Sequence, residues 1–306
     1  MNIFLPEGRL IDTEENIRNI ELLKRSELPL PCFSVLEARA TLCDTEKNLH
    51  VDLCGLHGII PYEESALSFG GEIKAISVIS KVNKPVMFVP VRFFELKNGE
   101  RAVLLSRKKA QQIFLEEYIE KLVPGDIIDA TVTRLEQFGA FCDIGAGISA
   151  LLPIDNISVS RIPHPKVRFV NGENIKAVVR SRDEFGRLIL SHRELLGTWE
   201  ENASLFKAGE TVPGIVRSVE EYGIFVELTP NLAGLAEYEE GIENGFNTSV
   251  YIKSINEQKM KIKLVIVDSF SADYPPEKTK YFIDKGHMDF WRYSPENCDK
   301  KIETVF

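Results

Sequence analysis

The chain has 306 residues, of which 44% are hydrophobic, and its formal net charge is −9. A chain of this length and apolar content is expected to fold into about two to three globular domains. The acidic balance excludes a protein that holds nucleic acid through a general excess of Lys and Arg, so any such contact must be local.

The beginning of the chain is not typical of an export signal. Its first apolar run is short and meets Glu7 too early for a signal peptide. No run approaches the roughly 18 apolar residues that a membrane-spanning helix requires. We therefore expect a cytoplasmic protein with no membrane partner.

The metal-binding and catalytic motifs that we sought are missing from the sequence. The cysteines form an odd set without a C-x-x-C pair, which argues against a zinc ribbon or a disulfide scaffold. They are expected to be reduced and mostly buried, and they are Cys32, Cys43, Cys54, Cys142 and Cys298. The histidines show no metal-ligand spacing, and no phosphate-binding loop, zincin helix or nucleophile elbow is present. The sequence predicts no catalytic residue, no metal and no cofactor.

The N-terminal segment is predicted to be helical. Asp12 with Glu15 three residues later has the spacing of a capping box, so a helix should begin there and run to about Ser26.

A repeat organises the rest of the chain. Phe138-Gly139 and the residues after it align without a gap with Tyr222-Gly223, 84 residues later, and Val51-Asp52-Leu53 begins a weaker upstream copy. The predicted organisation is a helical segment (1–31), a degenerate barrel (32–106), a helical linker (107–123), a barrel (124–191), a second helical linker (192–207), a divergent barrel (208–267) and an aromatic-rich extension (268–306).

Each repeat reads as about five short strands separated by Gly, Pro, Asn and Asp. In the second repeat the strands are expected near residues 127–134, 138–144, 149–153, 174–181 and 187–191. Five strands in about 70 residues are too few for a two-sheet sandwich and indicate an OB-type barrel. The predicted fold class is therefore mainly β, with three tandem five-stranded OB-type barrels joined by short α-helical linkers.

Aromatic residues mark the second strand of two repeats. Period-two alternation turns Ala140, Cys142 and Ile144 inward, so Phe141 and Asp143 should face outward. By the same alternation, Phe225 and Glu227 should face outward in the third repeat, and Phe138 and Tyr222 add a second ring to each strand. Such rings either pack on cross-strand neighbours or an adjoining domain, or form a face on which bases stack.

Basic residues cluster around the second repeat. Arg180, Arg182 and Arg187 flank the loop between its fourth and fifth strands, and further basic residues follow its third strand at Arg161, His164, Lys166 and Arg168. A solvated loop is the alternative reading of such a run. Asp183 either accepts a hydrogen bond from a ribose or a base, or caps the turn in which it lies.

Residues 125–191 resemble the S1 RNA-binding domain, with the pattern F-G-A-F-x-D followed by L-L-P and D-x-x-G-R-x-x-L-S. The resemblance implies RNA contact by Phe138, Phe141, Asp183 and Arg187, whereas Pro153 replaces the family's histidine. The third repeat is similar but divergent, with Tyr222, Phe225 and Lys261 in the aromatic and basic positions and Glu237 in place of the histidine.

The first repeat resembles the opening repeat of bacterial ribosomal protein S1 and carries Lys47 and His50 in place of the rings. That likeness implies docking on the small ribosomal subunit through the first barrel.

The C-terminal extension should form a β-hairpin, with a first arm at 281–283, a turn at 284–286 and a second arm at 287–293. Phe290, Trp291 and Tyr293 are expected to pack on the third barrel.

We expect a non-catalytic protein that binds single-stranded RNA, including messenger RNA. The alternative is an adaptor that docks on the ribosome, RNA polymerase or a ribonuclease and binds little RNA itself. The oligomeric state stays open. The predicted RNA-binding residues are Phe138, Phe141, His164, Lys166, Arg168, Arg180, Asp183, Arg187, Tyr222, Phe225 and Lys261.

Overall fold

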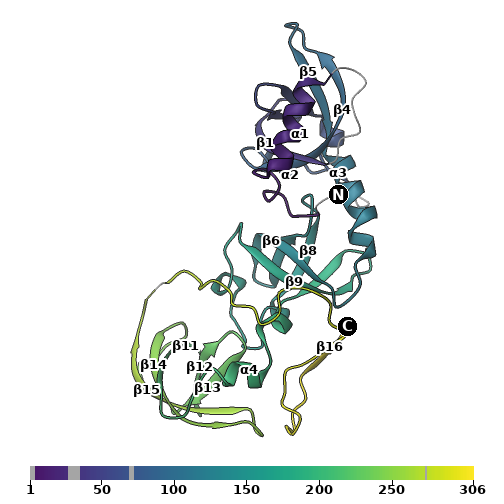
Figure 1. Cartoon of the computed structure of the whole chain (residues 1–306). Coiled ribbons are helices and arrows are strands. Elements are labelled where there is room, and N and C mark those ends of the chain that lie inside the picture. Colours follow the sequence, from purple (N-terminus) through teal and green to yellow (C-terminus); the bar gives the residue numbers. More distant parts are fainter. Residues whose placement is uncertain (1–3, 27–34, 69–71, 273) are drawn as a thin grey trace. The chain divides into compact units, whose positions relative to one another are not determined.

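A computed structural model describes residues 4–26, 35–68, 72–272 and 274–306. It contains three closed five-stranded barrels, which follow one another along the chain in Figure 1. The predicted fold class, three tandem OB-type barrels, is confirmed. Cys32 and the expected boundary between residues 31 and 32 lie outside the described residues.

The three barrels share one strand order. The first barrel contains β1 (Leu36–Cys43), β2 (Leu49–Asp52), β3 (His57–Ile60), β4 (Pro85–Glu95) and β5 (Arg101–Ser106). The second contains β6 (Ile127–Glu136), β7 (Gly139–Asp143), β8 (Ser149–Pro153), β9 (Asn174–Arg182) and β10 (Leu188–Ser191). The third contains β11 (Thr211–Glu220), β12 (Gly223–Thr229), β13 (Leu232–Ala236), β14 (Asn247–Asn256) and β15 (Lys261–Phe270). In each barrel the third and fifth strands pair in parallel, and the other pairings described are antiparallel.

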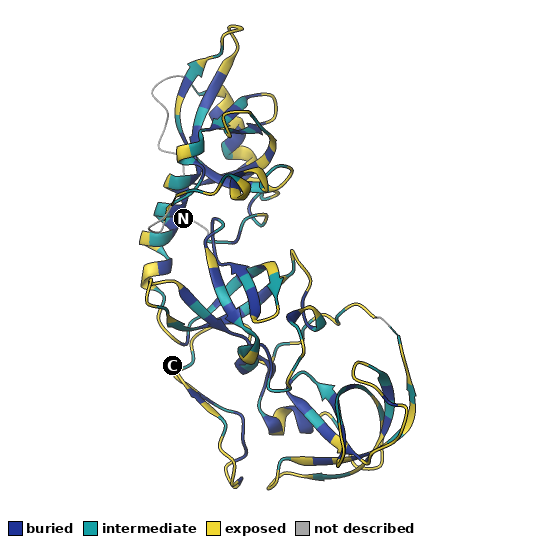
Figure 2. Cartoon of the chain, turned by 180° about the vertical axis from the view of Figure 1, so that it is seen from behind, coloured by how far each residue is buried: buried dark blue, intermediate teal, exposed yellow. Residues whose placement is uncertain are grey.

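The core of each barrel consists of inward-facing side chains that alternate with outward-facing ones. In the first barrel, Val51, Phe88 and Leu105 are fully buried. In the third barrel, Val226 and Val250 are fully buried in the core. Figure 2 shows this buried lining in dark blue. Each such aliphatic or aromatic side chain contributes about 1.5–3 kcal/mol through the hydrophobic effect, so these residues stabilise the closed barrels.

Helix α1 (Glu14–Arg25) begins one residue later than a capping box at Asp12 predicts. The Thr13 side chain accepts a hydrogen bond from the backbone N–H of Asn16, so Thr13 is the N-cap. Asp12 cannot be the N-cap, because the N-cap directly precedes the first helical residue, which is Glu14. The helix ends before Ser26, as predicted.

The two linkers differ. After β5, the first linker forms α3 (Arg107–Glu117) and the short η2 (Ile119–Lys121). The second is not one helix, because Gly197 takes a φ of +82° between η5 (Arg193–Leu196) and α4 (Trp199–Ala203). Short helices within the barrels are η1 (Tyr62–Glu64), α2 (Ala75–Ile79), η3 (Ile154–Asn156) and η4 (Pro165–Val167). In the described part of the chain, no helix combines the length and the apolar character needed to cross a membrane.

The C-terminal hairpin forms in a different place from the one predicted. β16 (Phe290–Arg292) pairs with β17 (Glu303–Val305), whereas residues 281–286 form no strand. Tyr281 instead accepts a hydrogen bond from the backbone N–H of Lys176 at 3.0 Å, so the expected first arm packs on the second barrel. The prediction that Trp291 and Tyr293 pack with the third barrel is confirmed, whereas Phe290 is 46% exposed.

The prediction of mostly buried thiols holds for two of the four described cysteines. Cys142 and Cys298 are buried, Cys43 is half-buried and Cys54 is exposed, and all four are free thiols. Cys54 departs from the prediction because it lies in the β2–β3 turn rather than in a strand.

The chain divides into two compact units, of which the first comprises residues 1–122, 129–131 and 143–149. Within this unit, Glu7 is nearly buried and receives Arg107 Nε at 2.8 Å and Lys81 Nζ at 2.6 Å. The backbone N–H of Glu7 donates to Asp143 at 2.8 Å. Asp143 points out of its barrel, as predicted, but it is buried because the N-terminal segment covers it.

These contacts shift the pKa values of the carboxyl groups in opposite directions. Burial alone would raise the pKa of Glu7, but the positive charges of Arg107 and Lys81 lower it to about 2. Burial and the neighbouring Glu7 charge raise the pKa of Asp143 to about 6. Burial also raises the pKa of Glu37, which accepts hydrogen bonds from Gly8 and Leu10, to about 7.

Glu7→Gln should lower the free energy of unfolding by about 3 kcal/mol at neutral pH, because it leaves the buried Arg107 without its carboxylate. Since the pKa of Glu7 falls on folding, its contribution is complete above the ordinary pKa of 4.5 and is lost as pH falls toward about 2. Urea unfolding of both proteins across this range measures the difference. Glu21→Gln, at an exposed helix position, is the control. Equal stability of Glu7→Gln and the wild type at neutral pH would contradict the prediction.

Candidate nucleic-acid interface

One row of outward-facing residues crosses the strands at the same place in each barrel. In the third barrel Phe225 pairs with Leu235, which pairs with Lys263. In the second barrel Leu151 pairs with Ile189, and β7, which carries Phe141, lies beside β8. Because Phe141 and Leu151 precede Phe225 and Leu235 by the 84-residue repeat, the two rows are equivalent.

Two rings stand at one end of the row in both barrels. The centroids of Phe138 and Phe141 lie 5.9 Å apart with the ring planes at 88°. Tyr222 and Phe225 repeat this geometry at 6.1 Å and 85°. Phe138 is 56% and Tyr222 70% exposed, while Phe141 and Phe225 are half-buried. Both pairs therefore present one open ring supported edge-on by a second.

The glycine after the first ring is required by the neighbouring strand. A Cβ on Gly139 would lie 2.4 Å from the carbonyl oxygen of Leu152, and a Cβ on Gly223 would lie 2.5 Å from that of Ala236. Only glycine allows this close approach of the two backbones. The aromatic-glycine pair thus places an exposed ring where the second and third strands meet.

One basic residue beside these rings, Arg134, was not predicted from the sequence. The Arg134 guanidinium lies 5.4 Å from the centroid of Phe141 and forms an exposed ion pair with Glu136 at 2.6 Å. The strand alternation of β6 breaks here, since Thr133 and Arg134 are both exposed. Because two successive residues are exposed, strict period-two alternation could not predict that Arg134 lies on this face.

The turn between β9 and β10 is held by Asp183. Its Oδ1 accepts the backbone N–H groups of Phe185 and Arg187, each at 2.9 Å, and its Oδ2 accepts Arg187 Nε at 2.7 Å. Slight desolvation would raise the pKa of Asp183, but these hydrogen bonds lower it. Of the two roles that the sequence leaves open for Asp183, turn capping is the one observed.

The same turn exposes a third ring, Phe185, which was not among the predicted RNA-binding residues. Phe185 is 68% exposed, and the Arg187 guanidinium lies 5.1 Å from its centroid. An apolar ring in a loop turn with no buried neighbour is the signal that could have identified it. The turn therefore presents an aromatic ring together with a cation.

Arg168, a predicted RNA contact, does not lie on an open surface. Arg168 is 8% exposed, and its Nη2 donates to Glu227 on β12. Arg217 Nε and Nη2 donate to the same carboxylate, each at 2.9 Å. Glu227 points out of the third barrel as the alternation requires, yet it is buried because the loop carrying Arg168 covers it. Burial would raise the pKa of Glu227, but the two arginines lower it.

The other predicted basic residues occupy different environments. Arg180 is partly exposed and lies 3.7 Å from the fully buried Glu194, so its charge is directed toward the second linker. His164 caps η4 by accepting the backbone N–H of Lys166 at 3.0 Å, and the Lys166 side chain is exposed.

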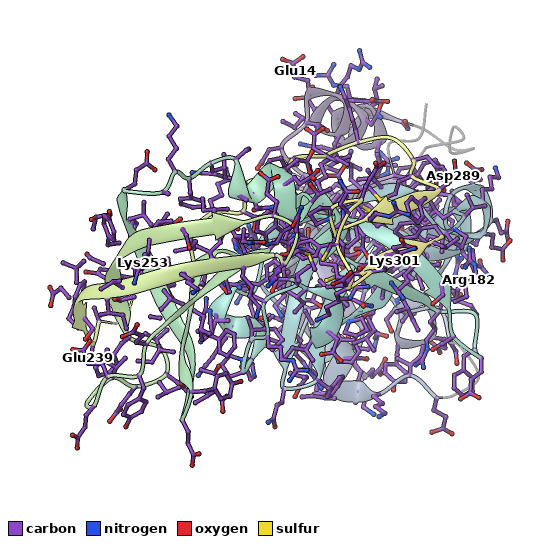
Figure 3. All side chains as sticks on the ribbon, turned by 90° about the horizontal axis from the view of Figure 1, so that it is seen from below. Glu14, Arg182, Glu239, Lys253, Asp289 and Lys301 are labelled. Atoms are coloured by element: carbon purple, nitrogen blue, oxygen red, sulfur yellow. The ribbon has the colours of Figure 1, made fainter. Side chains whose placement is uncertain are left out.

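Lys261 is exposed at the start of β15. Lys263 and Ile189 are equivalent because each pairs with the same position of the third strand in its barrel. Lys261 and Arg187 each lie two residues before that position, so they are equivalent as well. Figure 3 labels two further basic residues on strands β9 and β14, Arg182 and Lys253.

The row in the first barrel has a different character. His50 pairs with Ile59, Ile59 with Leu104, and Leu104 with Arg92. His50 Nδ1 lies 2.9 Å from His57 Nε2, and its Nε2 lies 3.1 Å from Asp44. Burial, followed by the nearby His50, lowers the pKa of His57. This face is thus aliphatic and polar where the other two are aromatic.

Comparison with known proteins agrees with this geometry. Residues 121–193 match the family model described as the S1 RNA binding domain. The second barrel belongs to the S1 RNA-binding domain family. Within this S1 domain, the position that the resemblance assigns to a histidine holds Pro153 at the end of β8.

Two curated relatives are small ribosomal subunit proteins. The chain is 30% identical over 249 residues to a small ribosomal subunit protein bS1 homolog of Bacillus cereus, covering 74% of this chain and 61% of that protein. It is 30% identical over 221 residues to bS1 of Leuconostoc lactis, covering 70% and 49%. The resemblance to the ribosomal protein S1 family is confirmed, and the chain spans about half to three fifths of these relatives' length.

Solved structures with some likeness include a multidomain protein with nucleic acid binding domains from Streptococcus pneumoniae. It is 14% identical, and the match covers 77% of this chain and 73% of that one with a TM-score of 0.26. GSP13 from Bacillus subtilis is 24% identical, with coverage of 24% and 57% and a TM-score of 0.23.

The buried carboxylate beside the S1 domain should be essential for stability. Glu227→Gln leaves Arg168 and Arg217 buried with no negative charge between them, so the free energy of unfolding should fall by about 3–5 kcal/mol. Urea unfolding measures the change. Glu220→Gln, at the exposed end of β11, should change it by less than about 0.5 kcal/mol. A similar small effect in both variants would show that the ion pairs are dispensable.

Proposed function

We propose that this protein binds single-stranded RNA without catalysing a reaction, and that the S1 domain holds the principal site. The observation that carries the proposal is the open ring of Phe138 supported by Phe141, with the Arg134 guanidinium beside it. Phe185 and Arg187 offer a further ring and cation from the β9–β10 turn. Rings and cations on the strand-two and strand-three face are suited to stacking unpaired bases and neutralising phosphates.

The energetics favour several barrels acting on one RNA. Base stacking contributes about 1–3 kcal/mol per base, so the two rings of one barrel supply about 2–6 kcal/mol. A single barrel would then bind weakly, and linked barrels gain through effective concentration. Tyr222, Phe225 and Lys261 form the assisting site on the third barrel, because they repeat the geometry of the S1 domain.

The relatives suggest a setting in translation. The relatives from Bacillus cereus and Leuconostoc lactis are named small ribosomal subunit proteins, which supports messenger RNA as the bound RNA and the cytoplasm as the location. The first barrel is proposed to dock on the small ribosomal subunit. Its outward row of His50, Ile59, Leu104 and Arg92 offers hydrogen bonds and apolar contact but no stacking ring.

That same row favours one alternative function, an adaptor that docks on the ribosome, RNA polymerase or a ribonuclease with little RNA affinity of its own. The two functions differ in whether the rings of the S1 domain bind bases. RNA binding is preferred because two barrels repeat the perpendicular ring pair, which packing against a protein does not require.

Phe138→Ala combined with Phe141→Ala should weaken binding of a single-stranded RNA of about ten nucleotides by at least about 30-fold, because two stacking contacts are lost. Fluorescence anisotropy at several salt concentrations measures this loss, and wild-type affinity should fall as salt rises. Tyr274→Ala removes an exposed ring from the C-terminal extension, away from this face, and is the control. Unchanged affinity in the double variant would refute this face, and no wild-type binding at low salt would favour the adaptor.

Arg92→Glu should reduce co-sedimentation with small ribosomal subunits while leaving the affinity for short RNA unchanged. Arg92 is exposed on the outward row of the first barrel, so reversing its charge opposes docking on a phosphate-rich partner. Lys97→Glu, an equally large charge change in the β4–β5 turn, controls for net charge. Full co-sedimentation of Arg92→Glu would argue against docking through this row.

A further inference from the structure

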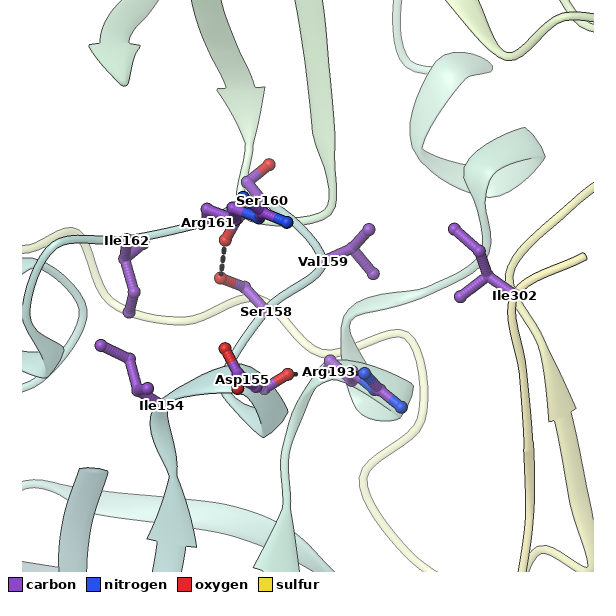
Figure 4. A pocket seen from close by; sticks show the side chains of 9 residues that line it. All are labelled: Ile154, Asp155, Ser158, Val159, Ser160, Arg161, Ile162, Arg193 and Ile302. Atoms are coloured by element: carbon purple, nitrogen blue, oxygen red, sulfur yellow. Dashed lines mark hydrogen bonds between the residues drawn. The ribbon is translucent and has the colours of Figure 1, made fainter. Parts of the chain in front are cut away.

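A pocket of about 400 Å³ lies next to the ring face of the S1 domain. Its walls come from the segment that follows β8, from η5 and from the C-terminal extension (Figure 4). The backbone N–H of Ile154, which lines the pocket, donates to the carbonyl oxygen of Phe138 at 2.9 Å. This bond joins the pocket wall to the residue that carries the open ring, so the pocket and the ring face are adjacent.

The walls are fixed by hydrogen bonds. The buried Asn231 accepts the backbone N–H of Val159 at 2.9 Å, and the Ser158 hydroxyl donates to the carbonyl oxygen of Ser160 at 2.9 Å. Arg193 donates to the carbonyl oxygen of Asp155 at 3.4 Å and to Thr304 at 3.2 Å. Arg193 is thus part of the wall, and the pocket is formed before any ligand arrives.

Two charged side chains of the pocket, one carboxylate and one guanidinium, are available to a ligand, and apolar side chains line the rest of its walls. Ile154 and Ile162 line one side and Ile302 the opposite side (Figure 4). Among the residues that the structure describes, neither the Asp155 carboxylate nor the Arg161 guanidinium has a hydrogen-bond or ion-pair partner, and both residues are exposed. The pocket therefore offers a carboxylate acceptor and a guanidinium donor around an apolar space.

This combination matches guanine better than the other bases. Guanine carries donors at N1 and N2 on one edge, which a carboxylate accepts, and acceptors at O6 and N7 on another, which an arginine recognises. Its flat faces can lie against the aliphatic walls, as unstacked bases do in RNA-binding proteins. Adenine and cytosine each lack part of this pattern, and uracil offers a single donor.

We propose that the pocket takes one guanine base of the RNA bound on the ring face, with Asp155 and Arg161 as the residues that determine specificity. The inference rests on the proposed function, since the pocket acts on RNA already held by Phe138 and Phe141. It assigns a sequence preference to a face whose stacking contacts alone discriminate poorly.

The test compares an oligouridine of about ten nucleotides with the same oligomer carrying one central guanosine, by fluorescence anisotropy on the full chain. The wild type should bind the guanosine oligomer about tenfold more tightly. Asp155→Asn should remove most of that preference while binding oligouridine within about twofold of the wild type. Arg161→Ala should also remove most of the preference, which is measured as the ratio of its affinities for the two oligomers because the lost charge weakens binding to both. Both side chains are exposed and unpaired among the described residues, so these variants keep the fold.

Arg18→Ala, which removes one exposed positive charge from α1, is the control and should keep the preference. Equal affinity of the wild type for both oligomers, or a full preference in Asp155→Asn and Arg161→Ala, overturns the pocket assignment and leaves the proposed function intact. A stronger preference for a single adenosine or cytidine overturns guanine as the ligand. Failure to bind either oligomer overturns the proposed function and this inference together.

Discussion

Parallel pairing of the third and fifth strands closes each barrel, and this closure decides which side chains can face outward. A small closed barrel has room inside for one alternating set of side chains, so Ala140 and Cys142 fill the core and Phe141 must point away from it. Phe225 and His50 hold the equivalent places in the other barrels. The binding character of each barrel therefore depends on which residue occupies one outward position.

Pointing out of a barrel is not the same as facing solvent. Asp143 and Glu227 both leave their barrels on the outward side, yet the N-terminal segment covers one and the loop carrying Arg168 covers the other. A carboxylate can be covered in this way only when it keeps charged or hydrogen-bonding partners. The outward polar positions on second strands thus anchor neighbouring segments, while the outward rings remain free.

The repeat and the period-two pattern predicted what depends on local sequence: the three barrels, their strand positions and the outward rings. Contacts between distant segments were not predictable, because nothing near Arg168 marks Glu227 as its partner. The position of the C-terminal hairpin was wrongly predicted for the same reason, because Tyr281 bonds to the second barrel rather than to a neighbouring strand. Thr13 was missed because cap spacing tolerates a shift of one residue, which only backbone geometry resolves.

Affinity and selectivity can arise from different parts of such a molecule. Stacking on Phe138 and Phe141 involves the face that all bases share, so it can hold RNA without distinguishing one sequence from another. Discrimination needs fixed donors and acceptors at a base edge, and these must stand on a rigid support. The segment after β8 meets that requirement because Asn231 and Arg193 fix its backbone, while Phe138 joins it to the stacking face through Ile154. Selectivity in this arrangement would be added beside the rings and would leave the stacking contacts unchanged.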